Sequence, residues 1–201
     1  RLGSSGSYFG TVSWGGDRGD EAESVATGPG GSVFVCGQFG GLVDFDPGPG
    51  DDFKGDPELY GGAFVSRFDT NLNYFFAQVW SGENTVYARN IEVDSSGRSY
   101  ALGTYEGPVD FDPAGRGLIK IYQSHERGGY LSCFDASGSL KWNLLNTSAD
   151  NLYFGAYALD AAGNLLMANR FNESADIDPT AGVDEYNIGE TYGNCLIKLL
   201  P

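Results

Sequence analysis

The sequence contains a regular internal repeat, and this periodicity constrains the fold more than any other feature. The segment VDFDP at 43–47 returns as VDFDP at 109–113 and as ADIDP at 175–179, so the three copies are equally spaced. Glycines at 31, 97 and 163 keep the same spacing, and SYFGTVSWGG at 7–16 aligns with NYFFAQVWSG at 73–82. A fixed period of this length indicates tandem copies of one structural unit.

Each unit is expected to form four antiparallel strands. In the first unit these are ESVAT, SVFVCGQF, AFVSRF and YFFAQVW, and the second alternates apolar residues over much of its length. The links DSSG, DAAG, DTNLN and DASGS are typical of tight turns, because Asp can bond its own backbone and Gly accepts positive φ. We therefore predict an all-β fold of tandem four-stranded blades at 17–82, 83–148 and 149–201, all within one repeat domain over 1–201.

The two ends of the sequence fall in the middle of a unit. Residues 1–16 match a fourth strand without a blade of its own, and the unit at 149–201 lacks its fourth strand. This phase predicts a circular permutation in which the N-terminal strand completes a C-terminal blade. Such sharing of one blade by both ends is how many propellers close.

The units resemble the bacterial extracellular beta-propeller repeat family, whose long-blade, VDFDPG-containing repeats are described as seven-bladed propellers. The match lies in GGSVFVCGQFGGLVDFDPGPG and GGAFVSRFD of the first unit and GRSYALGTYEGPVDFDP and GGYLSCFDASGSLKW of the second. The third unit, GNLLMANRFNESADIDP, is more divergent. The resemblance implies a propeller architecture and an extracellular or cell-surface location, and it implies no particular activity.

Three blades are too few for a closed propeller, in which four to eight are typical. Two chains could form one ring, chains could donate strands head to tail into a filament, or flanking repeats of a longer chain could supply the missing blades. A β-prism with pseudo-threefold symmetry is the alternative fold. The predicted interface residues are Tyr8, Phe9, Val12, Trp14, Leu196, Lys198 and Leu200.

The repeated DxD motif has two interpretations. Carboxylates at i and i+2 of a strand face the same side, and calcium takes six to eight such oxygen ligands. The alternative is a capping turn in which each carboxylate accepts backbone N–H groups without a metal. Because Leu118 replaces the third acid of the second unit, its calcium site should be the weakest. The candidate ligands are Asp44, Asp46, Asp52, Asp110, Asp112, Asp176, Asp178 and Asp184.

The composition argues against several functional classes. A net charge of -15 disfavours nucleic acid, and no apolar run is long enough for membrane insertion. A single histidine offers little to a nucleophilic triad, and the first-strand acids Glu21, Glu23 and Glu92 are only weak glycosidase candidates. We therefore expect no enzyme.

Other residues carry weaker expectations. Asn146 and Asn172 begin N-glycosylation sequons. The three cysteines are expected to be small buried strand residues. Trp14, Trp80 and Trp142 are assigned to fourth strands, with Trp142 shifted along its strand, and we expect these side chains to pack against the next unit. The cysteines are Cys36, Cys133 and Cys195.

These observations together favour an acidic, extracellular structural or interaction protein that assembles by β-strand complementation between units or chains, as a surface or filament subunit. Its partners would be other copies of itself or flanking repeats. The alternative function is a lectin-like carbohydrate-binding module that binds glycans on loops or exposed aromatic residues, and a glycosidase is less favoured.

Overall fold

The computed structural model describes residues 6–58, 60–82, 84–112, 119–120, 127–147, 152–178 and 182–200. These residues form an all-β fold of antiparallel sheets, with one 3-10 turn at Pro29–Gly31 and no α-helix in the described ranges. Within the same ranges, no helix is long and apolar enough to cross a membrane. The predicted all-β class is confirmed.

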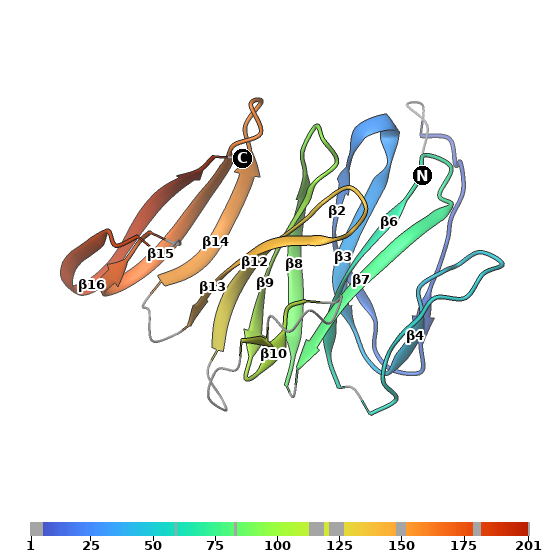
Figure 1. Ribbon diagram of the computed structural model, residues 1–201, viewed down its shortest axis with the longest axis horizontal. Helices are drawn as coiled ribbons and strands as arrows, with labels where there is room; N and C mark the ends of the chain where they lie inside the picture. The colour runs from blue at the N-terminus through green and yellow to red at the C-terminus, as the bar shows by residue number, and fades with distance from the viewer. Residues whose placement is uncertain are drawn as a thin grey trace.

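Three sheets stand side by side in a row (Figure 1). The first contains β2 (Glu21–Thr27), β3 (Val33–Phe39), β6 (Gly62–Phe68) and β7 (Tyr74–Gly82). The second contains β8 (Val86–Val93), β9 (Ser99–Glu106), β12 (Arg127–Phe134) and β13 (Leu140–Thr147). The third contains β14 (Leu152–Leu159), β15 (Leu165–Asp176) and β16 (Glu185–Leu199). In each sheet these strands pair with their neighbours in this order.

Short corner ribbons join successive units. β4 (Leu42–Asp44) pairs with β5 (Phe53–Gly55) and with β1 (Gly15–Gly16), while β10 (Val109–Asp110) pairs with β11 (Ile119–Lys120) and with the end of β7. The pair Gly16–Val43 returns one repeat later as Gly82–Val109. The VDFDP segment therefore adds itself to the fourth strand that precedes its own sheet.

Apolar side chains fill the spaces between sheets. One core cluster joins sheets one and two, and a second joins sheets two and three. All three cysteines are free thiols on strands; the expected burial is confirmed for Cys36 and Cys133, whereas Cys195 is only half-buried. Burial raises the pKa of Cys36 and of Cys133 to about 12, so these thiols stay protonated and unreactive at neutral pH.

Backbone conformation repeats with the same period. Gly41 and Gly107 have φ values of 74° and 75°, in the left-handed region that glycine enters without strain. The third unit has Glu173 at this position, with φ of 48°. A glutamate in this conformation carries a local strain that the other two units avoid.

The register of β16 departs from the repeat. In sheet one Phe39 pairs with Gly62, and the same spacing would set Phe171 opposite Asn194, but Phe171 pairs with Gly193. Because strand faces alternate, a shift of one residue turns every side chain to the other face. Ile197 consequently packs into the core shared with sheet two. This burial favours the shifted register, because β16 has only one described neighbour and no fourth strand among the described residues holds it in the register of the repeat.

Candidate functional site

The outer edge of β16 is the main candidate site. Among the described residues β16 pairs only with β15, whereas β6 and β12 each have a fourth strand on their outer side. Figure 1 places β16 at the outer margin of the row. An uncovered edge presents a row of backbone N–H and C=O groups that can template another strand.

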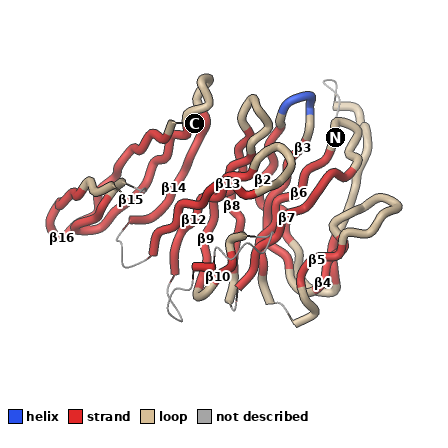
Figure 2. The backbone as a smooth tube through the Cα atoms, in the orientation of Figure 1, coloured by secondary structure: helices blue, strands red, loops and turns tan. Residues whose placement is uncertain are grey.

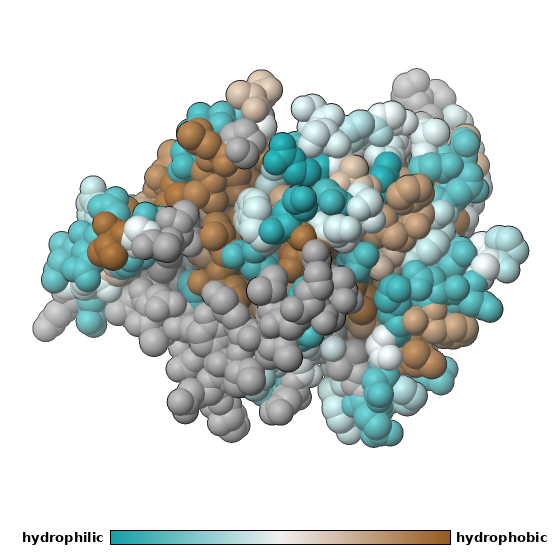
Figure 3. All heavy atoms as spheres, viewed as in Figure 1, coloured by the Kyte–Doolittle hydropathy of each residue, from teal (hydrophilic) through white to brown (hydrophobic). Residues whose placement is uncertain are grey.

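The face next to this edge is apolar and exposed. Leu196 and Leu200 are 73% and 78% exposed, although their counterparts Tyr130 and Phe134 in sheet two are fully buried. Figure 3 shows apolar residues gathered over the third sheet, on the left of the view. The predicted interface residues on this strand thus share one exposed face, with Lys198 between the two leucines.

Lys198 holds β16 to the neighbouring turn. Its ammonium group lies 3.0 Å from a carboxylate oxygen of Asp160. Hydrogen bonds from Asn164 and from Lys198 hold the pKa of Asp160 well below its usual value. This pair is solvent-exposed, so it adds little stability. The ion pair fixes the position of the Lys198 ammonium group, and it does not cover the backbone edge of β16.

The N-terminal segment occupies the place of a fourth strand before sheet one. The Trp14 ring lies 5.1 Å from the Phe68 ring and 6.2 Å from the Phe64 ring, between centroids. One repeat later, Trp80 packs in the same way on Phe134 and Tyr130. The expectation that these tryptophans pack against the next unit is therefore confirmed for both.

The remaining predicted interface residues lie on the same segment. Val12 is half-buried and borders a small hollow beside Trp14, while Tyr8 and Phe9 are exposed. The segment and β16 lie at opposite ends of the row of sheets (Figures 1 and 2). They are therefore not paired with each other within one chain.

The DxD corners have the geometry of capping turns. Asp44 Oδ1 accepts the backbone N–H groups of Asp46 at 3.1 Å and of Asp52 at 2.9 Å. β4 ends at Asp44, so the alternation of side chains along a strand does not extend to Asp46. The Asp52 carboxylate is engaged by Lys54 at 2.6 Å and by the Tyr74 hydroxyl.

The other two corners follow the first. Asp176 Oδ1 accepts the N–H groups of Asp178 at 3.0 Å and of Asp184 at 2.8 Å, and Asp110 Oδ1 accepts that of Asp112 at 2.9 Å. Leu118 lies outside the described residues. No group of three or more potential metal ligands forms within the described ranges. Calcium binding at the corners stays a prediction.

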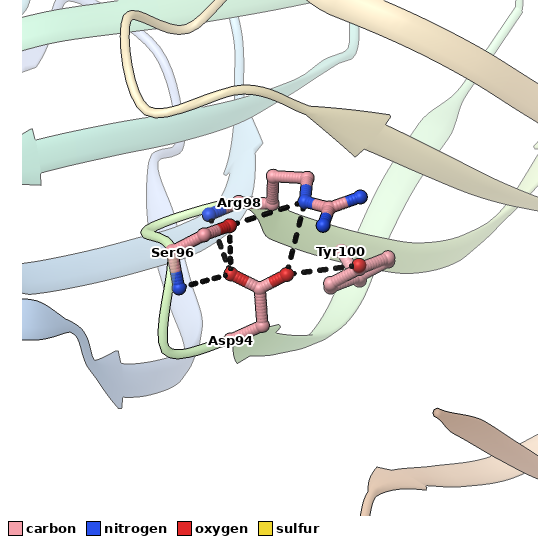
Figure 4. Close-up of polar contacts among 4 residues, drawn as sticks. All are labelled: Asp94, Ser96, Arg98 and Tyr100. Atoms are coloured by element: carbon pink, nitrogen blue, oxygen red, sulfur yellow. Dashed lines mark hydrogen bonds and ion pairs between the residues drawn. The ribbon is translucent and has the colours of Figure 1, made fainter. Parts of the chain in front are cut away.

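Aspartates also hold the tight turns between strands, as the sequence predicted. Asp94 Oδ1 accepts hydrogen bonds from the N–H and hydroxyl of Ser96 and from the N–H of Arg98, at 2.8, 2.7 and 3.0 Å (Figure 4). Asp94 Oδ2 lies 3.1 Å from Arg98 Nε and accepts the Tyr100 hydroxyl at 3.2 Å. Burial alone would raise the pKa of Asp94, but these hydrogen bonds and the Arg98 charge hold it below its usual value.

The first-strand acids engage neighbouring polar groups. Glu23 forms an ion pair with Arg89, its counterpart one repeat later, and Glu21 accepts a hydrogen bond of 2.7 Å from Gln38. Burial raises the pKa of Glu92. Ser24 likewise donates to its counterpart Asn90 at 3.0 Å. Successive first strands therefore touch at equivalent positions.

The two predicted glycosylation asparagines differ in access. Asn146 is only 5% exposed, and its Oδ1 accepts the Gly129 N–H at 2.7 Å. Asn172 is half-buried, and its amide donates to the Tyr153 hydroxyl at 3.2 Å. Glycosylation stays a prediction, and at Asn146 it would require the side chain to leave its present place.

Comparisons with known proteins add no identity. Neither the family models nor the curated proteins searched contain a match to this chain. The resemblance to long-blade propeller repeats therefore stays a prediction, and function has to be argued from the geometry alone.

Proposed function

We propose that the protein is an extracellular structural or interaction subunit that assembles by β-strand complementation. The N-terminal segment of one copy, or of a flanking repeat, would add to the β16 edge of another. One observation carries the proposal. At one end of the row, the N-terminal segment occupies the place of a fourth strand, but no first, second or third strand precedes it among the described residues. At the other end, the outer edge of β16 is uncovered among the described residues.

The repeat specifies how the two pieces would pair. Val65 faces Gln78 in sheet one, and Leu131 faces Leu144 in sheet two, at the junction of third and fourth strands. Carried forward by one repeat, with the one-residue shift of β16 included, this register sets Leu196 opposite Val12 and Gly193 opposite Gly15. The proposed contact is therefore a defined ladder.

A propeller-like arrangement fits the contacts between first strands. The pairs Glu23–Arg89 and Ser24–Asn90 join equivalent positions of β2 and β8, as expected for strands grouped around a common centre. Strand donation would then continue the row of sheets as a closed ring of two chains or as a filament. A β-prism with pseudo-threefold symmetry is the alternative arrangement.

Burial of exposed apolar side chains would drive the association. Leu196, Leu200 and Tyr8 are all more than two-thirds exposed in the single chain. Full burial of a large apolar side chain contributes about 1.5–3 kcal/mol, before the entropic cost of association is subtracted. The new backbone hydrogen bonds would supply direction and register.

Disulfide trapping tests the proposed ladder. In the double variant Val12→Cys with Leu196→Cys, the new thiols would face each other in the predicted register, at a spacing that a disulfide can bridge. We expect cross-linked dimers or higher species on non-reducing gels. The matched control, Val12→Cys with Ile197→Cys, is one residue out of register, carries its second thiol on the opposite face of β16 and should cross-link poorly. Equal cross-linking of both pairs, or of neither, would contradict the proposed register.

A further inference from the structure

A cavity of about 460 Å³ lies between sheets two and three. One wall comes from β8, β9, β12 and β13 of sheet two, and the other comes from Tyr153 and Phe154 at the start of β14. The volume falls within the range of about 300–1,000 Å³ that small-molecule sites occupy. The cavity is separate from the β16 edge.

The cavity exists because one tryptophan of the repeat is missing. Ala63 pairs with Trp80 in sheet one, and the equivalent pair in sheet two is Gly129 with Asn146. Trp80 fills the space between sheets one and two. Asn146 is much smaller, and Phe154, which stands where the preceding unit has Ala88, packs over Gly129 and fills only part of the corresponding space between sheets two and three. Trp142 does not replace it, because Trp142 stands at the position of Phe76.

The lining combines aromatic surface with polar groups. Tyr87, Tyr153 and Phe154 contribute rings, and the side chain of Asn146 lies among them. Glu106 and Arg127 also line the cavity and form an ion pair of 3.2 Å, in which the Arg127 side chain is largely exposed. Because these two charges balance, the site favours a neutral ligand that carries hydroxyl groups.

We propose that this cavity binds a neutral saccharide ring. A sugar ring presents a C–H face that packs on aromatic side chains, and its hydroxyl groups can both donate and accept hydrogen bonds. Glu106 would accept hydroxyl hydrogens and Arg127 would donate to hydroxyl oxygens. An indole would reproduce the shape of the missing tryptophan side chain, but its single donor leaves most of these polar groups unused.

Calorimetric titration of the intact protein tests the proposal, with cellobiose, lactose and chitobiose as the saccharide probes and indole as the comparison. We expect saturable binding of at least one saccharide. Asn146→Trp should fill the cavity and abolish that binding, and it should lower the melting temperature because the buried Gly129 N–H loses its acceptor. Glu106→Gln preserves the shape of its side chain and should weaken the binding about tenfold, because a hydrogen bond to a charged carboxylate becomes a weaker one to a neutral amide oxygen.

Three results would overturn the inference. They are no saturation by any of the three saccharides, saccharide binding that survives in Asn146→Trp, and saturable binding of indole alone. If Asn146→Trp does not fold, the exposed variant Arg127→Gln decides together with Glu106→Gln, and unchanged affinity in both rejects the site. Failure of strand complementation would leave these titrations unaffected, so the two proposals are tested separately.

Discussion

Replacement of Trp80 by alanine should be among the most destabilising single changes in the chain. Trp80 is 2% exposed, lies 5.5 Å from the Phe134 ring in a stacked orientation and meets Tyr130 edge-on. Burial of an aromatic side chain removes about 150–250 Å² from water, which corresponds to roughly 4–6 kcal/mol as an upper value. Measured costs of similar truncations are about 3–5 kcal/mol, so we expect a loss of that size in the free energy of unfolding.

Urea unfolding, followed by circular dichroism, measures this loss. Trp14→Ala is the matched control, because Trp14 occupies the same position in the repeat but is only half-buried beside sheet one. We expect the control to cost about 1–2 kcal/mol in the isolated chain, in proportion to its smaller buried area. A cost for Trp80→Ala equal to or below that of Trp14→Ala would refute the view that this residue couples sheets one and two.

The remaining predictions concern strain, acid sensitivity and calcium. Glu173→Gly should raise the free energy of unfolding by about 0.5–1 kcal/mol, because relief of the left-handed strain exceeds the entropic cost of glycine. Gly41→Ala should lower the free energy of unfolding, because it introduces the same strain. A melting temperature that falls in Glu173→Gly and rises in Gly41→Ala would refute this. The pKa of Asp94 is lowered in the folded state, so its contribution to the free energy of unfolding is fully present above the unfolded pKa and is lost as pH falls through the folded pKa. Asp94→Asn should therefore lower the free energy of unfolding by about 1.5–3 kcal/mol at neutral pH, and by less below pH about 4. A gap between the two unfolding curves that does not narrow in acid would contradict it. If the DxD corners bind calcium, a chelator should lower the melting temperature, and Asp44→Asn should remove this sensitivity more fully than Asp110→Asn. A melting temperature that does not change with chelator would reject calcium and support the capping turn as the only role of the corners.

Much of the fold follows from local patterns in the sequence. The alternation of apolar residues and the Asp-Gly turns predict the strands, since both signals act between residues close in the chain. The repeat also predicts the matched positions of Trp14 and Trp80. The capping interpretation of the DxD corners agrees with the hydrogen bonds of Asp44 and Asp176. Calcium binding at these corners depends on a bound ion, and the sequence does not show whether that ion is present.

Two features of the candidate sites do not follow so directly from the sequence. The register of β16 depends on which neighbours cover the strand, and no local pattern distinguishes the Leu196 face from the Ile197 face. The assignment of Trp142 as a shifted counterpart of Trp80 conceals the cavity. The spacing of the repeat sets Asn146 at that position, and the strand pairing agrees. The repeat spacing therefore predicts the absence of a tryptophan at this position of the second unit.

The mass of the native assembly, with and without residues 1–16, tests strand complementation most directly. Sedimentation of the isolated 201-residue chain should give a dimer or larger species, and deletion of residues 1–16 should reduce it to single chains with an uncovered β16 edge. An intact chain that sediments as a monomer would contradict complementation between copies of this chain, and a deletion variant that keeps the assembled mass would contradict the role of the N-terminal segment.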